Sequence, residues 1–388
     1  MSLRDVLHQD GAMQQLRRAM SSQRVPHAFL FHGPAGVGKE LTAIGFAELM
    51  LCANPVETPL DSPAGGVIPA YAVAHQSCGT CDDCRAVRAG SHPDLHIIHR
   101  RLNREHRDAQ VRKRKAIDIS VDVLRQFVIE AVGLTPTRGR AKIFILREAE
   151  RMSDAAQNAL LKTLEEPPGA TFIVLLADGV DSFLPTTISR CQLVTFQRLP
   201  DEFVRRRLDE LRPQVSREVR AWCAALANGS IGAACQAVDD VLFEVNGRVT
   251  AILGAARDID DAGNVEALLT EAKGLGHLYG KRDPEISETD ALRTGLNTVL
   301  SLLARHFAGQ LREAVASRPE ARSSERRISE SDNEISRRTS SPRPREIDII
   351  RRIALAEHHL DQNVNTQLVV ESLLIDIARK FERAAIQG

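Results

Sequence analysis

The segment Gly33-Pro34-Ala35-Gly36-Val37-Gly38-Lys39-Glu40 has the glycine and lysine spacing of a phosphate-binding loop, or P-loop. It follows the apolar run 27–32, which predicts a buried strand, and precedes residues 41–51, which predict a helix. In this context backbone N–H groups and the helix N-terminus face the bound phosphate. The segment therefore predicts an α/β nucleotide-binding domain. The nucleotide-binding residues would be Gly33, Gly36, Val37, Gly38 and Lys39.

Two positions depart from the pattern of an active ATPase. The residue after the loop lysine should be a Ser or Thr that holds Mg²⁺, but here it is Glu40. The apolar run 142–146 predicts the strand that carries the second metal-binding acid, yet the next residue is Arg147. Glu148 then remains as the candidate base. We expect ATP binding to stay open, because the glycines and Lys39 are intact, and we expect hydrolysis to be lost.

The pattern of the chain predicts three domains. Residues 1–199 alternate short apolar runs with helical segments, which indicates a mostly parallel sheet with helices on both faces. Residues 200–240 predict a small helical domain, and residues 241–388 predict longer helices. Within this last domain, residues 318–346 are polar and charged, so we expect a disordered loop there.

The individual elements can be predicted from periodicity and end signals. Expected strands are 28–31, 95–98, 142–146 and 171–176. Expected helices are 39–52, 121–132, 153–164, 201–211, 217–226 and 232–238.

Four cysteines have the spacing of a metal site. Cys78, Cys81 and Cys84 are separated by two-residue gaps, and Cys52 ends the predicted P-loop helix. Four thiolates around Zn²⁺ form a closed structural site, so we predict a zinc module over residues 52–84. His75 or His92 remains an alternative to Cys52. An iron–sulfur cluster uses the same ligands, but nothing else in the sequence suggests electron transfer.

Composition limits the class of protein. The chain has 388 residues, is 43% hydrophobic and carries no formal net charge, so a bulk attraction to nucleic acid is not indicated. No apolar run is long enough for a membrane helix and no signal peptide is evident, which predicts a cytoplasmic protein with reduced cysteines. The basic stretch 100–115 is read either as a solvated loop or as a patch for DNA or a partner. It lacks aromatic residues for base stacking.

Several motifs together resemble a known family. They are Asn158-Ala159-Leu160-Leu161-Lys162-Thr163-Leu164-Glu165-Glu166-Pro167-Pro168, Ser189-Arg190-Cys191, the four-cysteine module and His359-Leu360-Asp361-Gln362-Asn363-Val364-Asn365. The chain resembles the clamp-loader subunits of bacterial DNA polymerase III, which are AAA+ proteins. Glu40 and Arg147 favour its delta-prime branch over the tau/gamma ATPase branch.

The resemblance implies a role for this chain within a larger assembly. Arg190 would be an arginine finger that acts in trans on ATP held by a neighbouring subunit. The resemblance also implies that residues 200–240 are a lid domain and residues 241–388 an all-α collar for oligomerisation. The lid lacks the family's nucleotide-sensing arginine, since Gly229-Ser230 is followed by Ile231. The implied partners are delta and tau/gamma subunits in a heteropentamer, and through the complex the sliding clamp and primer-template DNA.

Two other functions stay open at this stage. The first is a catalytically active tau/gamma-like ATPase subunit of the same clamp loader. The second is a zinc-binding nucleic-acid adaptor that uses the basic stretch 100–115, which the zero net charge opposes.

Overall fold

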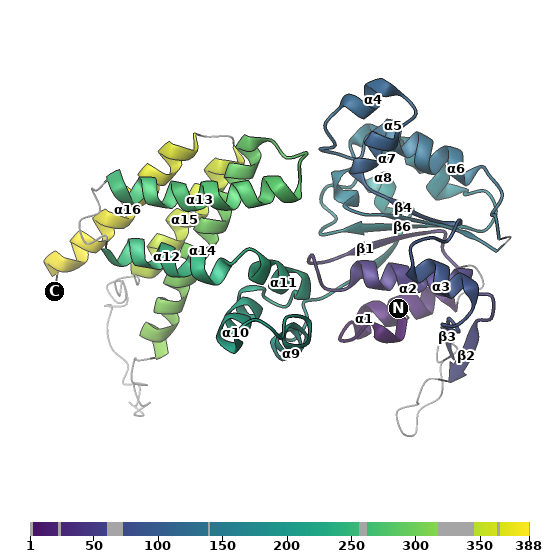
Figure 1. Ribbon diagram of the computed structural model, residues 1–388, viewed down its shortest axis with the longest axis horizontal. Coiled ribbons are helices and arrows are strands. Elements are labelled where there is room, and N and C mark those ends of the chain that lie inside the picture. Colours follow the sequence, from purple (N-terminus) through teal and green to yellow (C-terminus); the bar gives the residue numbers. More distant parts are fainter. Residues whose placement is uncertain are drawn as a thin grey trace, which may run out of the picture. The chain divides into compact units, whose positions relative to one another are not determined.

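Five parallel strands form the core of the N-terminal part of the chain (Figure 1). Their order in the sheet is β4-β5-β6-β1-β7, and every neighbouring pair is parallel. The P-loop strand β1 therefore lies between β6 and β7, inside the sheet. The strands are β1 (Ala28–His32), β4 (Leu95–Ile98), β5 (Lys142–Leu146), β6 (Thr171–Ala177) and β7 (Gln192–Thr195).

The computed structural model describes residues 3–21, 25–59, 73–138, 140–255, 262–316, 345–362 and 365–387. The chain divides into two units, Met1–Asp239 and Asp240–Gly388, and each is described here by itself. The expected disordered stretch 318–346 lies outside the described residues, except for its last two positions, which begin α15 (Arg345–Asp361). No helix in the described ranges is long and apolar enough to cross a membrane.

Helices cover both faces of the sheet, which explains why its strands are apolar at nearly every position. On one face, Phe46 of α2 (Lys39–Leu51) packs against Phe29, with ring centroids 5.2 Å apart. On the other face, Leu30 joins a buried cluster with Val123 and Leu160 from the helices that follow β4 and β5. Successive residues of β1 thus point to opposite layers, as expected for a strand.

The sequence predictions match this unit closely. The α/β fold class is confirmed, and the four expected strands are present. Ser153 caps α7 (Asp154–Glu165), where its hydroxyl accepts a hydrogen bond from the Ala156 N–H at 3.3 Å. The expected helix 121–132 is irregular: α5 (Val121–Leu124) and α6 (Glu130–Val132) flank a π-helical turn, η4 (Arg125–Ile129).

Other elements of this unit are short or lie at its edges. The strand β7 and the antiparallel hairpin of β2 (Val56–Pro59) and β3 (Val73–Gln76) were not expected from the sequence. The remaining helices are η1 (Leu3–Asp5), α1 (Asp10–Met20), α3 (Asp82–Arg88), η3 (Arg100–Glu105), α4 (Ala109–Lys113), η5 (Ala149–Arg151) and α8 (Pro185–Ile188). Helices α9 (Asp201–Leu211), α10 (Arg217–Leu226) and α11 (Ile231–Asp239) follow the sheet.

The second unit is helical throughout its described residues. It contains α12 (Leu242–Ala255), α13 (Ala262–Arg282), α14 (Glu288–Ala316), α15 and α16 (Thr366–Gln387). Leu296, Val299 and Leu303 of α14 are buried, and so are Ile353 and Leu360 of α15.

Helices α13 and α14 approach closely at a glycine. A Cβ at Gly295 of α14 would lie 2.1 Å from the Ala272 carbonyl oxygen of α13, far inside normal contact. Because the obstacle is backbone, a side chain at this position would force the two helices apart.

We expect Gly295→Ala to lower the free energy of unfolding by about 1–3 kcal/mol, since overpacking outweighs the better helix propensity of alanine. Gly274→Ala on α13 is the matched control, because a Cβ there meets nothing within 4 Å. It should stabilise the unit by about 0.5–1 kcal/mol. Urea unfolding of the full chain, followed by helical circular dichroism, measures both. Equal stability of the two variants would contradict the close helix approach.

Candidate functional site

The carboxyl ends of the central strands enclose a cavity of about 540 Å³. The loops that follow β1, β5 and β6 supply its charged lining, because the carboxyl ends of parallel strands meet at one edge of the sheet. Its lining includes the P-loop residues Gly36, Gly38 and Lys39, together with Glu40, Arg147, Glu148, Glu150, Arg151 and Asp178. The structure thus brings three of the predicted nucleotide-binding residues, Gly36, Gly38 and Lys39, together with both departures from the ATPase pattern. The other two, Gly33 and Val37, are not part of this lining.

Lys39 is hydrogen-bonded within the protein. Its ammonium donates to the Pro34 carbonyl at 2.8 Å, to Asp178 Oδ1 at 2.8 Å and to the Gly33 carbonyl. The side chain is only 9% exposed, whereas that of Asp178 is 58% exposed. All three donors of the ammonium therefore have acceptors, so a phosphate would have to displace them. Asp178 was missed by the sequence analysis, although it directly follows a strongly apolar strand.

Glu40 and Arg147 form an ion pair with each other, through Arg147 Nη2 and Glu40 Oε1. Both side chains are about two-fifths exposed, at 42% for Arg147 and 43% for Glu40. Glu40 lies in the first turn of α2, and Arg147 follows β5. The two residues that depart from the ATPase pattern therefore neutralise each other's charge. They lie at the edge of the sheet where a metal-binding hydroxyl and acid would be expected.

Charge in the cavity does not favour phosphate. Its lining holds four acidic side chains (Glu40, Glu148, Glu150 and Asp178) and three basic ones (Lys39, Arg147 and Arg151). Burial raises the pKa of Glu150, and the nearby charges of Asp178 and Glu148 raise it further.

The candidate base Glu148 is also engaged. Its carboxylate accepts a hydrogen bond from Arg100 Nε at 3.1 Å and lies 3.4 Å from Arg151 Nε. Its backbone has a positive φ of 50°. Glu148 is therefore paired with two arginines of the same chain.

Helix α11 begins directly against the P-loop. The Ser230 hydroxyl donates to the Ala35 carbonyl at 2.7 Å, and the Gly232 N–H donates to the Gly36 carbonyl at 3.2 Å. A Cβ at Gly36 would lie 2.6 Å from Ser230 Oγ. The start of α11 therefore contacts the loop through the side chain of Ser230 and the backbone of Gly232.

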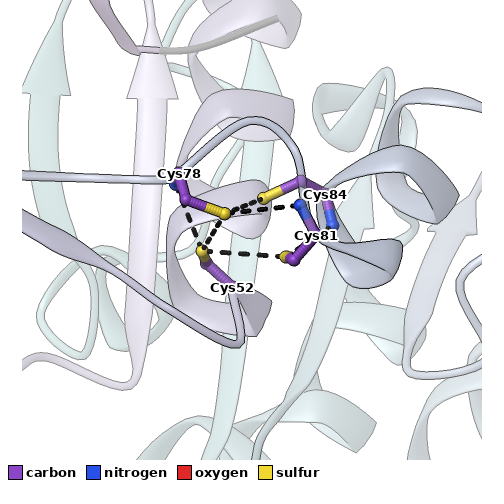
Figure 2. Close-up of side chains that lie close together, drawn as sticks. All are labelled: Cys52, Cys78, Cys81 and Cys84. Atoms are coloured by element: carbon purple, nitrogen blue, oxygen red, sulfur yellow. Dashed lines mark hydrogen bonds between the residues drawn. The ribbon is translucent and has the colours of Figure 1, made fainter.

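The four predicted metal ligands converge at a second site (Figure 2). Cys52 is the C-cap of α2, Cys78 and Cys81 lie in the loop before α3, and Cys84 lies in its first turn. The sulfur atoms all lie within 4.8 Å of one another. Sγ–Sγ distances are 3.5 Å for Cys52–Cys78, 4.0 Å for Cys52–Cys81 and 3.9 Å for Cys78–Cys84. A tetrahedral zinc with Zn–S bonds of about 2.3 Å requires about 3.8 Å, so the cluster could hold zinc.

Backbone amides support thiolates at this cluster. The N–H groups of Cys78, Cys81 and Cys84 point at the sulfur atoms of Cys52, Cys78 and Cys81 at 3.2, 3.4 and 3.4 Å. The amides of Thr80 and Cys81 lower the pKa of Cys78 to about 6. Burial raises the pKa of Cys52 and of Cys84. A cation at the centre would offset that burial cost, because metal ligation deprotonates thiols.

The alternative ligand His92 is used elsewhere. Its Nδ1 accepts the Asp94 N–H at 3.1 Å, and its Nε2 lies 3.4 Å from Asp83 Oδ1. The side chain of His75 lies outside the described residues. Among described residues, the cysteine cluster contains Cys52 and no histidine.

A buried carboxylate fastens the cysteine module to α2. Glu48 is fully buried and accepts hydrogen bonds from Arg88 Nη2 at 2.7 Å, Arg88 Nε at 3.0 Å and the Ser77 hydroxyl at 2.8 Å. Burial alone would raise the pKa of Glu48, but the hydrogen bonds from Arg88 and Ser77 outweigh it and lower that pKa. Sequence reasoning missed this clamp, because its three residues are polar and far apart in the chain.

Arg140 makes a second attachment between the module and the sheet. Its Nη1 donates to the Cys52 carbonyl and its Nη2 to the Ala53 carbonyl, both at 2.6 Å. These carbonyls lie at the end of α2, where helix carbonyls lack intrahelical partners. The arginine therefore fixes the backbone of one predicted metal ligand.

Arg190 lies in the turn between α8 and β7, outside the cavity. Its side chain is 30% exposed and forms an ion pair with Glu165 at the end of α7. The structure thus places the predicted arginine finger apart from this chain's own P-loop.

Much of the basic stretch 100–115 is paired within the protein. Arg100 contacts Glu148, Arg107 contacts Glu130 at 2.6 Å and Arg114 contacts Asp122 at 2.9 Å. Arg112 donates to the His106 carbonyl at 2.7 Å. These contacts support the solvated-surface interpretation over a nucleic-acid patch.

We expect Arg88→Ala to destabilise the first unit by about 3 kcal/mol, because the buried carboxylate of Glu48 loses its charged partner. Arg85→Ala on the same helix is the control, since Arg85 pairs with Asp82 at the exposed surface and its loss should leave stability close to that of wild type. Thermal unfolding followed by the fluorescence of the one tryptophan, Trp222, reports on this unit. Adding Glu48→Gln to Arg88→Ala should recover part of the loss.

The stability that this clamp provides depends on pH, because the pKa of Glu48 is lowered in the folded protein. The contribution of Glu48 to stability is present above its ordinary pKa and is lost as pH falls through the lowered folded-state value. The Arg88→Ala variant should lose less stability than wild type on acidification. Equal losses for Arg88→Ala and Arg85→Ala at neutral pH would contradict the clamp.

Comparison with known proteins gives the family. Residues 8–200 match the family described as "DNA polymerase III, delta subunit". The tau subunit of Escherichia coli DNA polymerase III is 30% identical over 70% of this chain and 38% of its own length. The delta' subunit of Pseudomonas aeruginosa is 35% identical over 42% of this chain and 41% of its own length. The delta' subunit of Bacillus subtilis is 31% identical over 52% of this chain and 51% of its own length.

These matches cover about two-fifths to one-half of each relative, 38% to 51% of its length. The family match over residues 8–200 includes the P-loop and all five strands of the parallel sheet. The chain belongs to the family of DNA polymerase III clamp-loader subunits.

Proposed function

We propose that the chain is a delta-prime-type subunit that assists ATP-driven loading of the sliding clamp without hydrolysing ATP itself. It acts in the cytoplasm as a scaffold and supplies Arg190 to a neighbouring ATPase subunit. The proposed partners are delta and tau/gamma subunits in a heteropentamer, and through them the clamp and primed DNA. Relatives that carry the names delta' and tau motivate this assignment.

The observation that carries the proposal is the Glu40–Arg147 ion pair. In a P-loop ATPase a hydroxyl at position 40 and an acid at position 147 would hold Mg²⁺, which neutralises charge on the transferred phosphate. Here a carboxylate and a guanidinium replace them and bind each other. The cavity's acidic excess and the internal hydrogen bonds of Lys39 also oppose a bound nucleotide.

The trans role of Arg190 is consistent with its position. A guanidinium that lies outside its own cavity can reach a γ-phosphate only in another subunit, where it would offset charge in the transition state.

The alternative is a tau/gamma-like ATPase subunit of the same machine. The intact loop glycines, Lys39 and the tau relatives favour it. The Glu40–Arg147 pair opposes it, and so does the engagement of Glu148 by two arginines. A zinc-binding nucleic-acid adaptor is opposed by the internal pairing of residues 100–115.

We also propose that Cys52, Cys78, Cys81 and Cys84 bind one structural Zn²⁺. The role of this zinc would be structural, because a closed four-thiolate site has no open coordination position for chemistry. The metal would stabilise the long connection between α2 and α3.

Elemental analysis of purified protein should find about one zinc per chain, the stoichiometry of a closed four-thiolate site. Cys81→Ser should lose most of it, whereas Cys235→Ser, a cysteine of α11 outside the cluster, should retain it. Less than about half an equivalent in wild type, or full retention in Cys81→Ser, would refute the metal site.

The isolated chain should not turn over ATP at an enzymatic rate, because the metal-binding hydroxyl and acid are absent. Steady-state phosphate release measures this directly, with Lys39→Ala as the control for contaminating activity. Turnover near one per second or faster that disappears in Lys39→Ala would favour the tau/gamma alternative, since typical enzymes work at roughly 1–10³ s⁻¹.

In a reconstituted clamp loader, Arg190→Ala should leave assembly intact and reduce DNA-stimulated ATP hydrolysis and clamp loading. Arginine fingers contribute about 10³–10⁵ in rate at a single site, but other sites in the complex remain, so the overall loss should be partial. Arg205→Ala, at an exposed arginine of α9, is the matched control. Unchanged clamp-loading rates in the Arg190→Ala complex would contradict the trans role.

A further inference from the structure

The side chain of Arg190 is held by two acceptors from its own chain. Its Nε donates to Glu165 Oε1 at 2.7 Å, and its Nη2 contacts the same oxygen. Its Nη1 donates to the Thr186 carbonyl at 2.9 Å and makes a weak contact with Ser189 Oγ at 3.5 Å. The guanidinium is therefore fixed on its Nε side.

The base of this side chain is also fixed by backbone. Arg190 follows the short helix α8, and its N–H donates to the Thr187 carbonyl at 3.2 Å. The Ser189 N–H donates to the Pro185 carbonyl at 3.0 Å. Helix α8 and the end of α7 thus hold opposite ends of the same arginine.

A carboxylate at the position of Glu165 is unfavourable for helix stability. Glu165 is the last residue of α7, where the helix macrodipole is negative and favours a basic side chain. Its contact with Arg190 offsets that unfavourable placement. The neighbouring Glu166 is also exposed and is the C-cap residue of α7, so it offers a direct comparison.

The contacts leave donors free for an incoming anion. A guanidinium has five N–H groups, and the strong contacts to Glu165 and Thr186 use three of them. Nη2 keeps a second N–H, and the second N–H of Nη1 has only the weak contact with Ser189. An anion that approaches these free donors meets the guanidinium on the side away from Nε.

We propose that Glu165 is a positioning residue for Arg190: it orients the guanidinium so that the free donors reach the γ-phosphate in a neighbouring subunit. This inference rests on the proposed trans role of Arg190. Correct orientation matters because a misplacement of about 1 Å in a catalytic group can cost on the order of 100-fold in rate.

The test uses a reconstituted clamp loader in which only the ATPase site facing Arg190 is active, because the P-loop lysine is replaced in the other ATPase subunits. Five complexes are compared: wild type and the variants Glu165→Ala, Glu165→Gln, Glu166→Ala and Arg190→Ala. A sixth complex carries Glu165→Ala and Arg190→Ala together. Steady-state kcat and KM for ATP are measured in each, and pentamer assembly and zinc content are checked first.

We expect Glu165→Ala to lower kcat about tenfold with little change in KM, since the finger acts in the transition state. Glu165→Gln should lose less because it keeps an acceptor oxygen, and Glu166→Ala should match wild type. Arg190→Ala should lose about 10³-fold or more. The double variant should equal Arg190→Ala, because Glu165 acts only through Arg190.

Wild-type or faster turnover in Glu165→Ala, with a loss in Arg190→Ala, would overturn this inference and leave the proposed function intact. A further loss on adding Glu165→Ala to Arg190→Ala would also overturn it, by showing a structural role. Wild-type turnover in Arg190→Ala would contradict the proposed function itself, and the positioning role would fail with it.

Discussion

The ion pair between Glu40 and Arg147 balances charge at the carboxyl edge of the parallel sheet. Beside it, Asp178 and two P-loop carbonyls accept the three hydrogen bonds of the Lys39 ammonium. A working phosphate site leaves such charges for its ligand and metal. Here they are satisfied within the protein, so the loop keeps its shape without the groups that hydrolysis needs. The trans role of Arg190 then becomes the way in which this subunit would contribute to chemistry.

Helix α2 connects the two candidate sites. Lys39 is its first residue, and Cys52 is its C-cap. Between them, Phe46 packs against the sheet and Glu48 binds Arg88 of the cysteine module. The P-loop and the cluster therefore share one rigid element that is buried against the sheet. Loss of the Glu48–Arg88 clamp would first displace the cysteines, because Arg88 and Cys84 lie on the same short helix.

The strongly patterned parts of this chain could be predicted from its sequence. Apolar runs predicted β1, β5 and β6, which are buried on both faces, and also the shorter β4. The strand β7 has the same length as β4, but it alternates polar and apolar residues and therefore has no apolar run. The cysteine spacing indicated the cluster. Glu40 and Arg147 were each recognised separately as departures from the pattern of an active ATPase. Their mutual pairing could not be predicted, since it depends on which strand ends meet. Asp178, Glu48 and Glu165 were missed for the same reason: each acts through a partner distant in sequence.

The most direct test of this charge balance is ATP affinity with and without metal. Isothermal titration of the full-length chain should give the same affinity in Mg²⁺ and in EDTA, or no measurable binding in either, because Arg147 and Glu40 occupy the metal's place. Tightening by tenfold or more in Mg²⁺, about 1.4 kcal/mol, would contradict the account. It would mean that the ion pair opens to admit a metal-bound nucleotide.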